Sequence, residues 1–186
     1  MNTTEPVKIP VLGIFGVGLI GGSLAMSLKN AGAVGRVIGV GRSRENLETA
    51  LERGAIDQIE SDPLTAAQEA DVIVLATPVH TISGLLDIIA PAIDDDKIVT
   101  DVGSVKSGIV DSARQVLGDR FNRFVPGHPV AGKEKSGINA AASDLFENHK
   151  VILTPTPETD VSACETIGRM WEATGAVVTT MDVGDH

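Results

Sequence analysis

Two polar side chains in this sequence, Ser104 and His128, have types and positions that could do chemistry. His128 lies in the stiff tripeptide Gly127-His128-Pro129, after a short predicted strand. A neutral imidazole there could accept the proton of a hydroxyl group whose carbon gives up hydride. Ser104 could offer its own hydroxyl to the same substrate. The residues alone leave two plainer alternatives open: a structural histidine, and a serine that caps a helix.

A glycine-rich stretch near the N-terminus, VLGIFGVGLIGGSL, predicts a dinucleotide-binding turn. Gly16, Gly18 and Gly21 have the GxGxxG spacing, follow an apolar strand and open a helix. Gly16 would turn the chain, Gly18 would let a pyrophosphate approach the backbone, and Gly21 would let the helix pack on its strand. The first helical residues, Leu19 and Ile20, would present N–H groups to the phosphates. A purely structural turn is the alternative.

The end of the second predicted strand indicates which dinucleotide is bound. An NAD-binding protein usually places Asp or Glu there to hold the ribose 2′-hydroxyl, whereas this chain has Gly41 followed by Arg42, Ser43 and Arg44. Two guanidinium groups and a hydroxyl could pair with a 2′-phosphate. The sequence therefore favours NADP over NAD. Alternatively, these residues only solvate the start of a helix.

Two further strand ends carry candidate cofactor contacts. Thr77 and Pro78 follow the fourth predicted strand, where a nicotinamide ribose would lie, although they could form a plain strand-to-helix turn. Gly103 belongs to the sequence DVGSVK after the next strand, beside Ser104. In parallel sheets, ligands bind beyond the carboxyl ends of the strands.

Strands and helices alternate along the chain, which predicts a parallel sheet with helices on both faces. The expected fold is α/β, Rossmann-like and doubly wound, with a mainly parallel sheet, in one domain over residues 8–180. A polar loop is expected over residues 127–137. The expected strands cover residues 11–15, 36–40, 56–60, 71–76, 97–102, 123–125, 151–154 and 177–180. The expected helices cover residues 19–30, 44–53, 63–70, 79–90, 105–117 and 161–173.

Composition excludes several classes of function. The chain has 186 residues and a net charge of −10, which argues against nucleic acid or an anionic membrane as the main partner. Its single cysteine, Cys164, permits no internal disulfide and is expected to pack rather than to react. The first ten residues lack the features of a signal peptide, no stretch is long and apolar enough to span a membrane, and no metal site is expected. These features predict a cytoplasmic protein.

The motifs together resemble one family, the prephenate/arogenate dehydrogenases of tyrosine biosynthesis. The resemblance is carried by residues 11–23, by DVGSVK at 101–106 and above all by the histidine loop GHPVAGKEKSG, and it covers essentially the whole chain. It implies that His128 is the catalytic residue and Ser104 its partner. It also implies that Glu134 lies near the substrate side chain and that His186 matches a histidine close to the active site.

The resemblance implies a reaction as well. A cyclohexadienol ring would lose hydride from C4 to NAD(P)⁺ while His128 accepts a hydrogen bond from the C4 hydroxyl; the C1 carboxylate would then leave and the ring would aromatise. Prephenate would give 4-hydroxyphenylpyruvate, and arogenate would give tyrosine. Two alternatives stay open: a nucleotide-binding module without catalysis, and another reductase of this fold that acts on a hydroxyacid or an imine.

Members of the family carry a second, helical domain that forms a homodimer and supplies an arginine for the ring carboxylate. Residues 181–186 correspond to the start of the hinge to that domain, so the chain looks like a truncated form or a fragment. We expect that cofactor binding could survive without the second domain and that substrate turnover could not.

Overall fold

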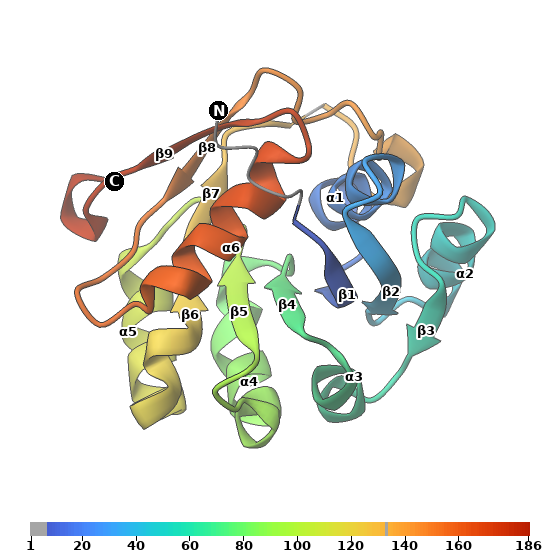
Figure 1. The fold of residues 1–186 in the computed structure, drawn as a ribbon. Helices are drawn as coiled ribbons and strands as arrows, with labels where there is room; N and C mark the ends of the chain where they lie inside the picture. The colour runs from blue at the N-terminus through green and yellow to red at the C-terminus, as the bar shows by residue number, and fades with distance from the viewer. Residues whose placement is uncertain (1–6, 133) are drawn as a thin grey trace.

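The largest element of the computed structural model, which describes residues 7–132 and 134–186, is a six-stranded sheet in the order β3-β2-β1-β4-β5-β6 (Figure 1). All neighbouring strands in it are parallel, as predicted. All residues of β4 (Val72–Leu75) and β5 (Ile98–Asp101) are buried, and for β4 this agrees with its continuous apolar sequence. The strands are β1 (Ile9–Phe15), β2 (Val34–Val40), β3 (Gln58–Glu60), β4 (Val72–Leu75), β5 (Ile98–Asp101) and β6 (Phe124–Val125).

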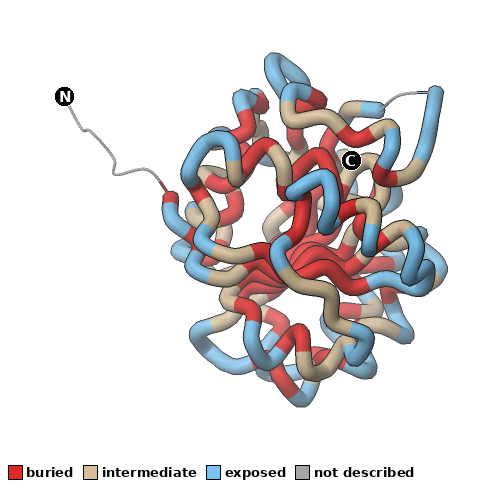
Figure 2. The backbone as a smooth tube through the Cα atoms, turned by 90° about the vertical axis from the view of Figure 1, so that its right-hand side faces the viewer, coloured by how far each residue is buried: buried red, intermediate tan, exposed pale blue. Residues whose placement is uncertain are grey.

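Helices cover both faces of this sheet and bury two separate apolar cores. One core lies under α1, α2 and α6, and the other lies under α3, α4 and α5. Figure 2 shows the buried backbone concentrated in the strands at the centre of the molecule. The doubly wound α/β prediction is confirmed. The helices are α1 (Leu19–Asn30), α2 (Arg44–Glu52), α3 (Pro63–Glu69), α4 (Val79–Ile89), α5 (Ser107–Leu117) and α6 (Val161–Glu172), with short 3₁₀ segments η1 (Ala90–Ala92), η2 (Gly118–Arg123), η3 (Ile138–Ala140) and η4 (Val183–Asp185).

Three of the six α-helices in the described part of the chain begin at a polar side-chain cap. Ser43 Oγ accepts the backbone N–H of Asn46 at the start of α2. Asp62 caps α3, whose first residue is a proline, and Asp160 caps α6. The start of α1 differs, because its N-cap is Gly18 and no side chain caps its N–H groups. This end of α1 therefore keeps its capacity to bind an anion.

A second, three-stranded sheet follows β6. It consists of β7 (Gly127–Pro129), β8 (Lys150–Leu153) and β9 (Val177–Thr180), with β7 antiparallel and β9 parallel to β8. The prediction of a loop over residues 127–137 was wrong for its first three residues, which pair with β8 so that His128 lies opposite Ile152. Three residues ending in a proline are too short to show a strand pattern in sequence. Residue 133 of the predicted loop lies outside the described residues.

Over residues 7–132 and 134–186, none of the helices has the length and apolar character needed to cross a membrane.

Candidate active site

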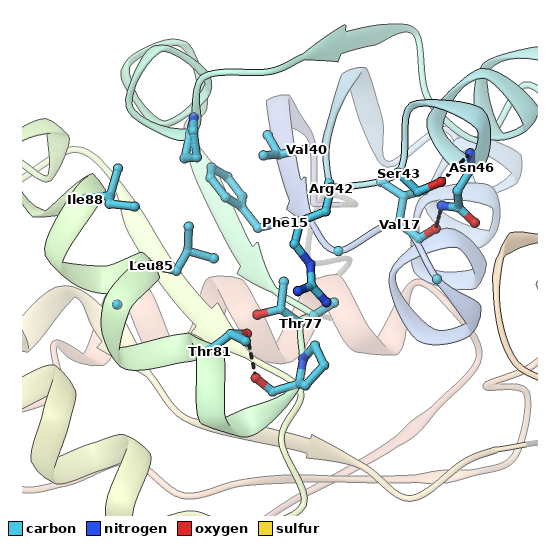
Figure 3. Close-up of a pocket in the computed structure, with 17 residues that line it drawn as sticks. Phe15, Val17, Val40, Arg42, Ser43, Asn46, Thr77, Thr81, Leu85 and Ile88 are labelled. Atoms are coloured by element: carbon cyan, nitrogen blue, oxygen red, sulfur yellow. Dashed lines mark hydrogen bonds between the residues drawn. The ribbon is translucent and has the colours of Figure 1, made fainter.

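A cavity of about 660 Å³ opens at the carboxyl ends of β1, β2 and β4 (Figure 3). It lies where the glycine-rich turn and the polar ends of β2 and β4 meet, as expected for an open parallel sheet. The predicted cofactor residues that line it are Gly16, Gly18, Arg42, Ser43, Thr77 and Pro78. The predicted residues Leu19, Ile20, Gly21, Arg44 and Gly103 are not in its wall.

The three glycines of the turn have three different surroundings. Gly16 has a φ of +102°, and a Cβ there would lie 2.6 Å from the carbonyl oxygen of Ala76. A Cβ at Gly21 would lie 2.2 Å from the carbonyl oxygen of Gly16, so this glycine lets α1 pack against the turn. A Cβ at Gly18 would meet nothing within 4 Å. Packing therefore requires Gly16 and Gly21, whereas Gly18 keeps open space in the cavity.

The polar groups around this space fit a dinucleotide. The N–H groups that begin α1 have no side-chain cap, and Gly18 leaves room for a phosphate to approach them. The buried hydroxyl of Thr77 lines the cavity and has no hydrogen-bond partner among the described residues. A buried hydroxyl normally has a partner, which a ribose or amide of a cofactor would supply here.

The arginines after β2 point in different directions. Arg42 extends into the cavity toward Thr77 (Figure 3), whereas Arg44 Nε donates to Glu48 Oε1 at 2.7 Å on the surface of α2. The i,i+4 spacing of Arg44 and Glu48 on a predicted helix could have indicated this pairing from the sequence. Of the two arginines, only Arg42 is a cavity residue.

Sequence analysis missed a polar contact in this region and the apolar wall of the cavity. Asn46 Nδ2 donates to the carbonyl oxygen of Val17 at 2.7 Å and so ties α2 to the glycine-rich turn. Leu85 and Ile88 of α4 form part of the apolar wall. The sequence of α4 could have indicated this wall, because two adjacent sets of residues recur along the helix at helical spacing. Ile82, Leu86 and Ile89 are buried in the core, while Thr81, Leu85 and Ile88 face the cavity.

The end of β5 holds a buried ion pair that sequence analysis did not predict. The Lys106 ammonium donates to Asp101 Oδ2, and the two side chains are 1% and 0% exposed. Lys106 also donates to the carbonyl oxygen of Gly127 at 2.7 Å. Asp101 accepts the backbone N–H of Gly103 at 2.8 Å and that of Gly127 at 3.2 Å. No sequence pattern marked Lys106, because a lysine before a helix is usually exposed.

His128 directly follows Gly127, whose backbone both members of this pair contact, and is half-buried. Its Nδ1 is 2.9 Å from Nε2 of His186, so one of these nitrogens donates a hydrogen bond to the other. Burial lowers the pKa of His128 below its ordinary value, and the nearby His186 and Lys106 lower it further. The imidazole is therefore neutral near pH 7 and able to accept a proton. We call His128, His186, Asp101, Lys106 and Gly127 the His128 corner.

The remaining predicted site residues lie on exposed loops. Ser104 is exposed between β5 and α5, and it does not cap α5, whose N-cap is Lys106. Glu134 is exposed in the loop after β7. The turn at Gly103 connects the cofactor cavity with the His128 corner. A Cβ at Gly103 would lie 3.3 Å from Val79, which is the first residue of α4 and directly follows Pro78.

The segment after the histidine loop is held by α1 and α2. Arg53, the C-cap of α2, donates to the carbonyl oxygens of Ile138 and Ala141. Ser23 of α1 accepts the backbone N–H of Ala142 at 3.0 Å. The loop that carries Glu134 is therefore anchored at β7 on one side and at α1 and α2 on the other.

Two other kinds of chemistry find little support in the described part of the chain. No three His, Cys, Asp or Glu side chains within residues 7–132 and 134–186 are grouped to hold a metal ion. Cys164 lies half-buried in α6, and burial raises the pKa of its thiol, which disfavours the reactive thiolate.

Comparison with known proteins agrees with this geometry. Residues 24–180 match the family described as prephenate dehydrogenase, nucleotide-binding domain. The prephenate dehydrogenase of Bacillus subtilis is 40% identical over 172 residues, which are 92% of this chain and 46% of that protein. The chain spans about half the length of the curated relatives it matches.

Solved structures agree with the sequence comparison. A prephenate dehydrogenase from A. aeolicus, in complex with hydroxyphenyl propionate and NAD⁺, superimposes with a TM-score of 0.91 at 36% identity, covering 98% of this chain and 63% of that one. Synechocystis arogenate dehydrogenase gives a TM-score of 0.86 at 36% identity, covering 95% and 61%. The family expected from the glycine turn and the histidine loop is confirmed: this chain belongs to the family of prephenate dehydrogenase nucleotide-binding domains.

Proposed function

We propose that this chain is the cofactor-binding part of an NAD(P)-dependent dehydrogenase that oxidises prephenate or arogenate and releases CO₂. The observation that carries the proposal is the position of His128, which is half-buried and directly follows Gly127; Gly127 is hydrogen-bonded to Asp101 at the carboxyl end of β5, the sheet edge that also holds the dinucleotide cavity. The relatives are named as dehydrogenases of prephenate and arogenate, which supports these two substrates.

In this proposal His128 acts as the base. Its lowered pKa keeps the imidazole able to accept a hydrogen bond, and then the proton, from the C4 hydroxyl of the ring. The bound cofactor supplies the hydride acceptor. Ser104 offers an exposed hydroxyl that can orient the substrate, while Glu134 and His186 would contact its side chain. The charge of Lys106 disfavours a protonated His128 before substrate arrives.

The residues after β2 support NADP as the preferred cofactor. Gly41 and Arg42 line the cavity where an NAD-specific protein places a carboxylate. The Arg42 guanidinium and the Ser43 hydroxyl are available to a 2′-phosphate, whereas Arg44 is engaged with Glu48. Thr77, Pro78 and the turn from Gly16 to Gly21 would hold the remaining parts of the dinucleotide.

The active enzyme in this proposal is a homodimer that includes further chain. The relatives are longer than this chain, and residues 181–186 would begin the connection to their second domain. The exposed apolar residues Val105 and Val130 lie close in sequence to Lys106 and His128, where a second domain could cover them.

A four-way assay tests the proposal. The protein carrying this chain and its second domain is incubated with prephenate or arogenate and with NAD⁺ or NADP⁺, and reduced cofactor is followed by absorbance. We expect turnover with one or both ring substrates and a preference for NADP⁺. Binding of either cofactor by calorimetry, together with no turnover in any of the four combinations, would contradict the assignment of the reaction.

A further inference from the structure

Neither residue of the buried ion pair at the end of β5 lines the cofactor cavity, and neither is the proposed base of the reaction. We propose that Asp101 and Lys106 are positioning residues, which fix the backbone at Gly127 and keep a positive charge beside His128 so that its imidazole stays in place and neutral. This inference rests on the proposed role of His128 as the base.

The pair differs from every other ion pair within residues 7–132 and 134–186. Lys106 and Asp101 are almost completely inaccessible, whereas the next most buried pair, Arg123 with Asp160, exposes 11% and 36% of its side chains. Removing two charges from water costs several kcal/mol per ion, and apolar residues of similar size often stabilise a fold equally well. Stability alone is therefore a poor reason for this pair.

The hydrogen bonds of the pair converge on one residue. Asp101 accepts the N–H of Gly127, and Lys106 donates to the carbonyl oxygen of the same residue. A side chain at Gly127 would place its Cβ 3.0 Å from the backbone oxygen of Asp101, so the two strands approach closely there. Because both backbone groups of Gly127 are fixed, the direction in which the chain enters His128 is fixed as well.

The charge of the pair also acts on the imidazole. Asp101 is surrounded by donors, namely two backbone N–H groups and the ammonium, which together offset its negative charge. Burial raises the pKa of Asp101 and lowers that of Lys106, while attraction between them acts the other way. The close contact and the two backbone donors favour the ionised pair.

The groups that face His128 come from three elements. Lys106 precedes α5, His186 follows η4, and both lower the pKa of His128. The residue opposite His128 on β8 is Ile152, which carries no charge. Of the two groups whose charge lowers the pKa of His128, Lys106 is the one that is permanently charged.

Histidine NMR titration of the 186-residue chain tests the proposal without turnover. Lys106→Met removes the positive charge and should raise the pKa of His128 by roughly half a unit or more. Asp101→Asn removes the negative charge and should lower it. Lys106 stays charged in this range, because the imidazole titrates below about 6.5 and the lysine pKa would have to fall by roughly four units to interfere. The double variant Asp101→Asn/Lys106→Met should give an intermediate value.

Arg123→Met is the matched control, since it breaks a partly buried ion pair away from His128 and should leave the titration unchanged. Shifts of the same sign in both single variants, or shifts no larger than in the control, would refute a charge effect. If a single variant does not fold, the neutral double variant still gives the comparison with the native chain. Failure of all three to fold would show a purely structural pair and overturn the proposal.

A kinetic measurement separates this inference from the proposed reaction. In the protein that turns over substrate, Lys106→Met should move the acidic limb of kcat/KM to higher pH by the same amount as the NMR shift. An NMR shift with no turnover in any variant or in the native protein would count against the reaction and leave the pair's effect on His128 established. An unmoved limb with normal turnover would overturn the inference and leave the reaction standing.

Discussion

The cofactor cavity and the His128 corner lie at the same edge of the molecule but consist of different kinds of residues. The cavity is formed by glycines, backbone groups and the apolar side chains of α4, and among the residues that the structure describes its single charged side chain is Arg42. The corner is formed by a buried ion pair and two histidines. Cofactor binding in the cavity therefore depends mainly on the volume that is available, whereas the protonation of His128 in the corner depends on nearby charges.

Replacing His128 should give the largest effect, because the corner contains the proposed base. His128→Asn keeps a polar group but removes the imidazole, so kcat should fall by roughly 10²–10⁴-fold while KM changes little. Steady-state kinetics of the two-domain protein would measure this. His149→Asn, at an exposed histidine before β8, is the control and should change neither constant. A loss below about tenfold would reduce His128 to a binding or structural role.

The cavity should respond to added volume, and its glycines should respond differently. Gly18→Ala fills open space and should weaken cofactor binding by about tenfold or more, a loss of about 1.4 kcal/mol, with little change in Tm. Gly21→Ala forces a Cβ against the Gly16 carbonyl and should lower stability by roughly 1–3 kcal/mol. Calorimetry and thermal unfolding of both variants measure the difference. Equal losses of stability would contradict the separate roles assigned to these glycines.

The one charged side chain of the cavity should set cofactor preference. Arg42→Ala should weaken NADP⁺ binding by roughly tenfold, since a hydrogen bond to a charged group contributes about 1.5–3 kcal/mol, and should leave NAD⁺ nearly unchanged. Arg44→Ala removes a surface pair with Glu48 and should have a smaller effect. Dissociation constants for both cofactors decide this. A native chain that binds NAD⁺ more tightly would contradict the preference.

The smallest expected effect is a shift in pH dependence. Because the pKa of His128 is lowered in the free protein, the acidic limb of kcat/KM should lie below the reference value of about 6.5. His186 contributes to that lowering, so His186→Asn should move the limb upward by roughly a few tenths of a unit. A pH–rate profile of both proteins tests the sign. A downward movement would show that His186 acts on His128 in some other way.

The two regions also differ in how well the sequence predicts them. The glycine turn and α1 follow local rules of spacing, and α1 is found at the predicted residues 19–30. The His128 corner depends on contacts between residues far apart in the chain, such as Asp101 with Gly127 and His128 with His186. The sequence motif DVGSVK contains both members of the buried ion pair, but nothing in it indicated that Lys106 is buried rather than exposed. Strand β7 was missed for the same reason, since its partner β8 is distant in sequence: Gly127 pairs with Leu153 and Pro129 with Val151.

The contacts of Arg53 matter for any attempt to exchange segments between relatives. Helix α2 begins next to Ser43 in the cavity wall and is followed by its C-cap Arg53, which donates to the carbonyl oxygens of Ile138 and Ala141. A chimera that imports a foreign α2 together with its C-cap, to change cofactor preference, would also replace the residue that holds the segment after the histidine loop. Grafts that stop at Glu52 keep Arg53 and leave these contacts intact. Grafts that continue to Gly54 must bring an arginine of their own.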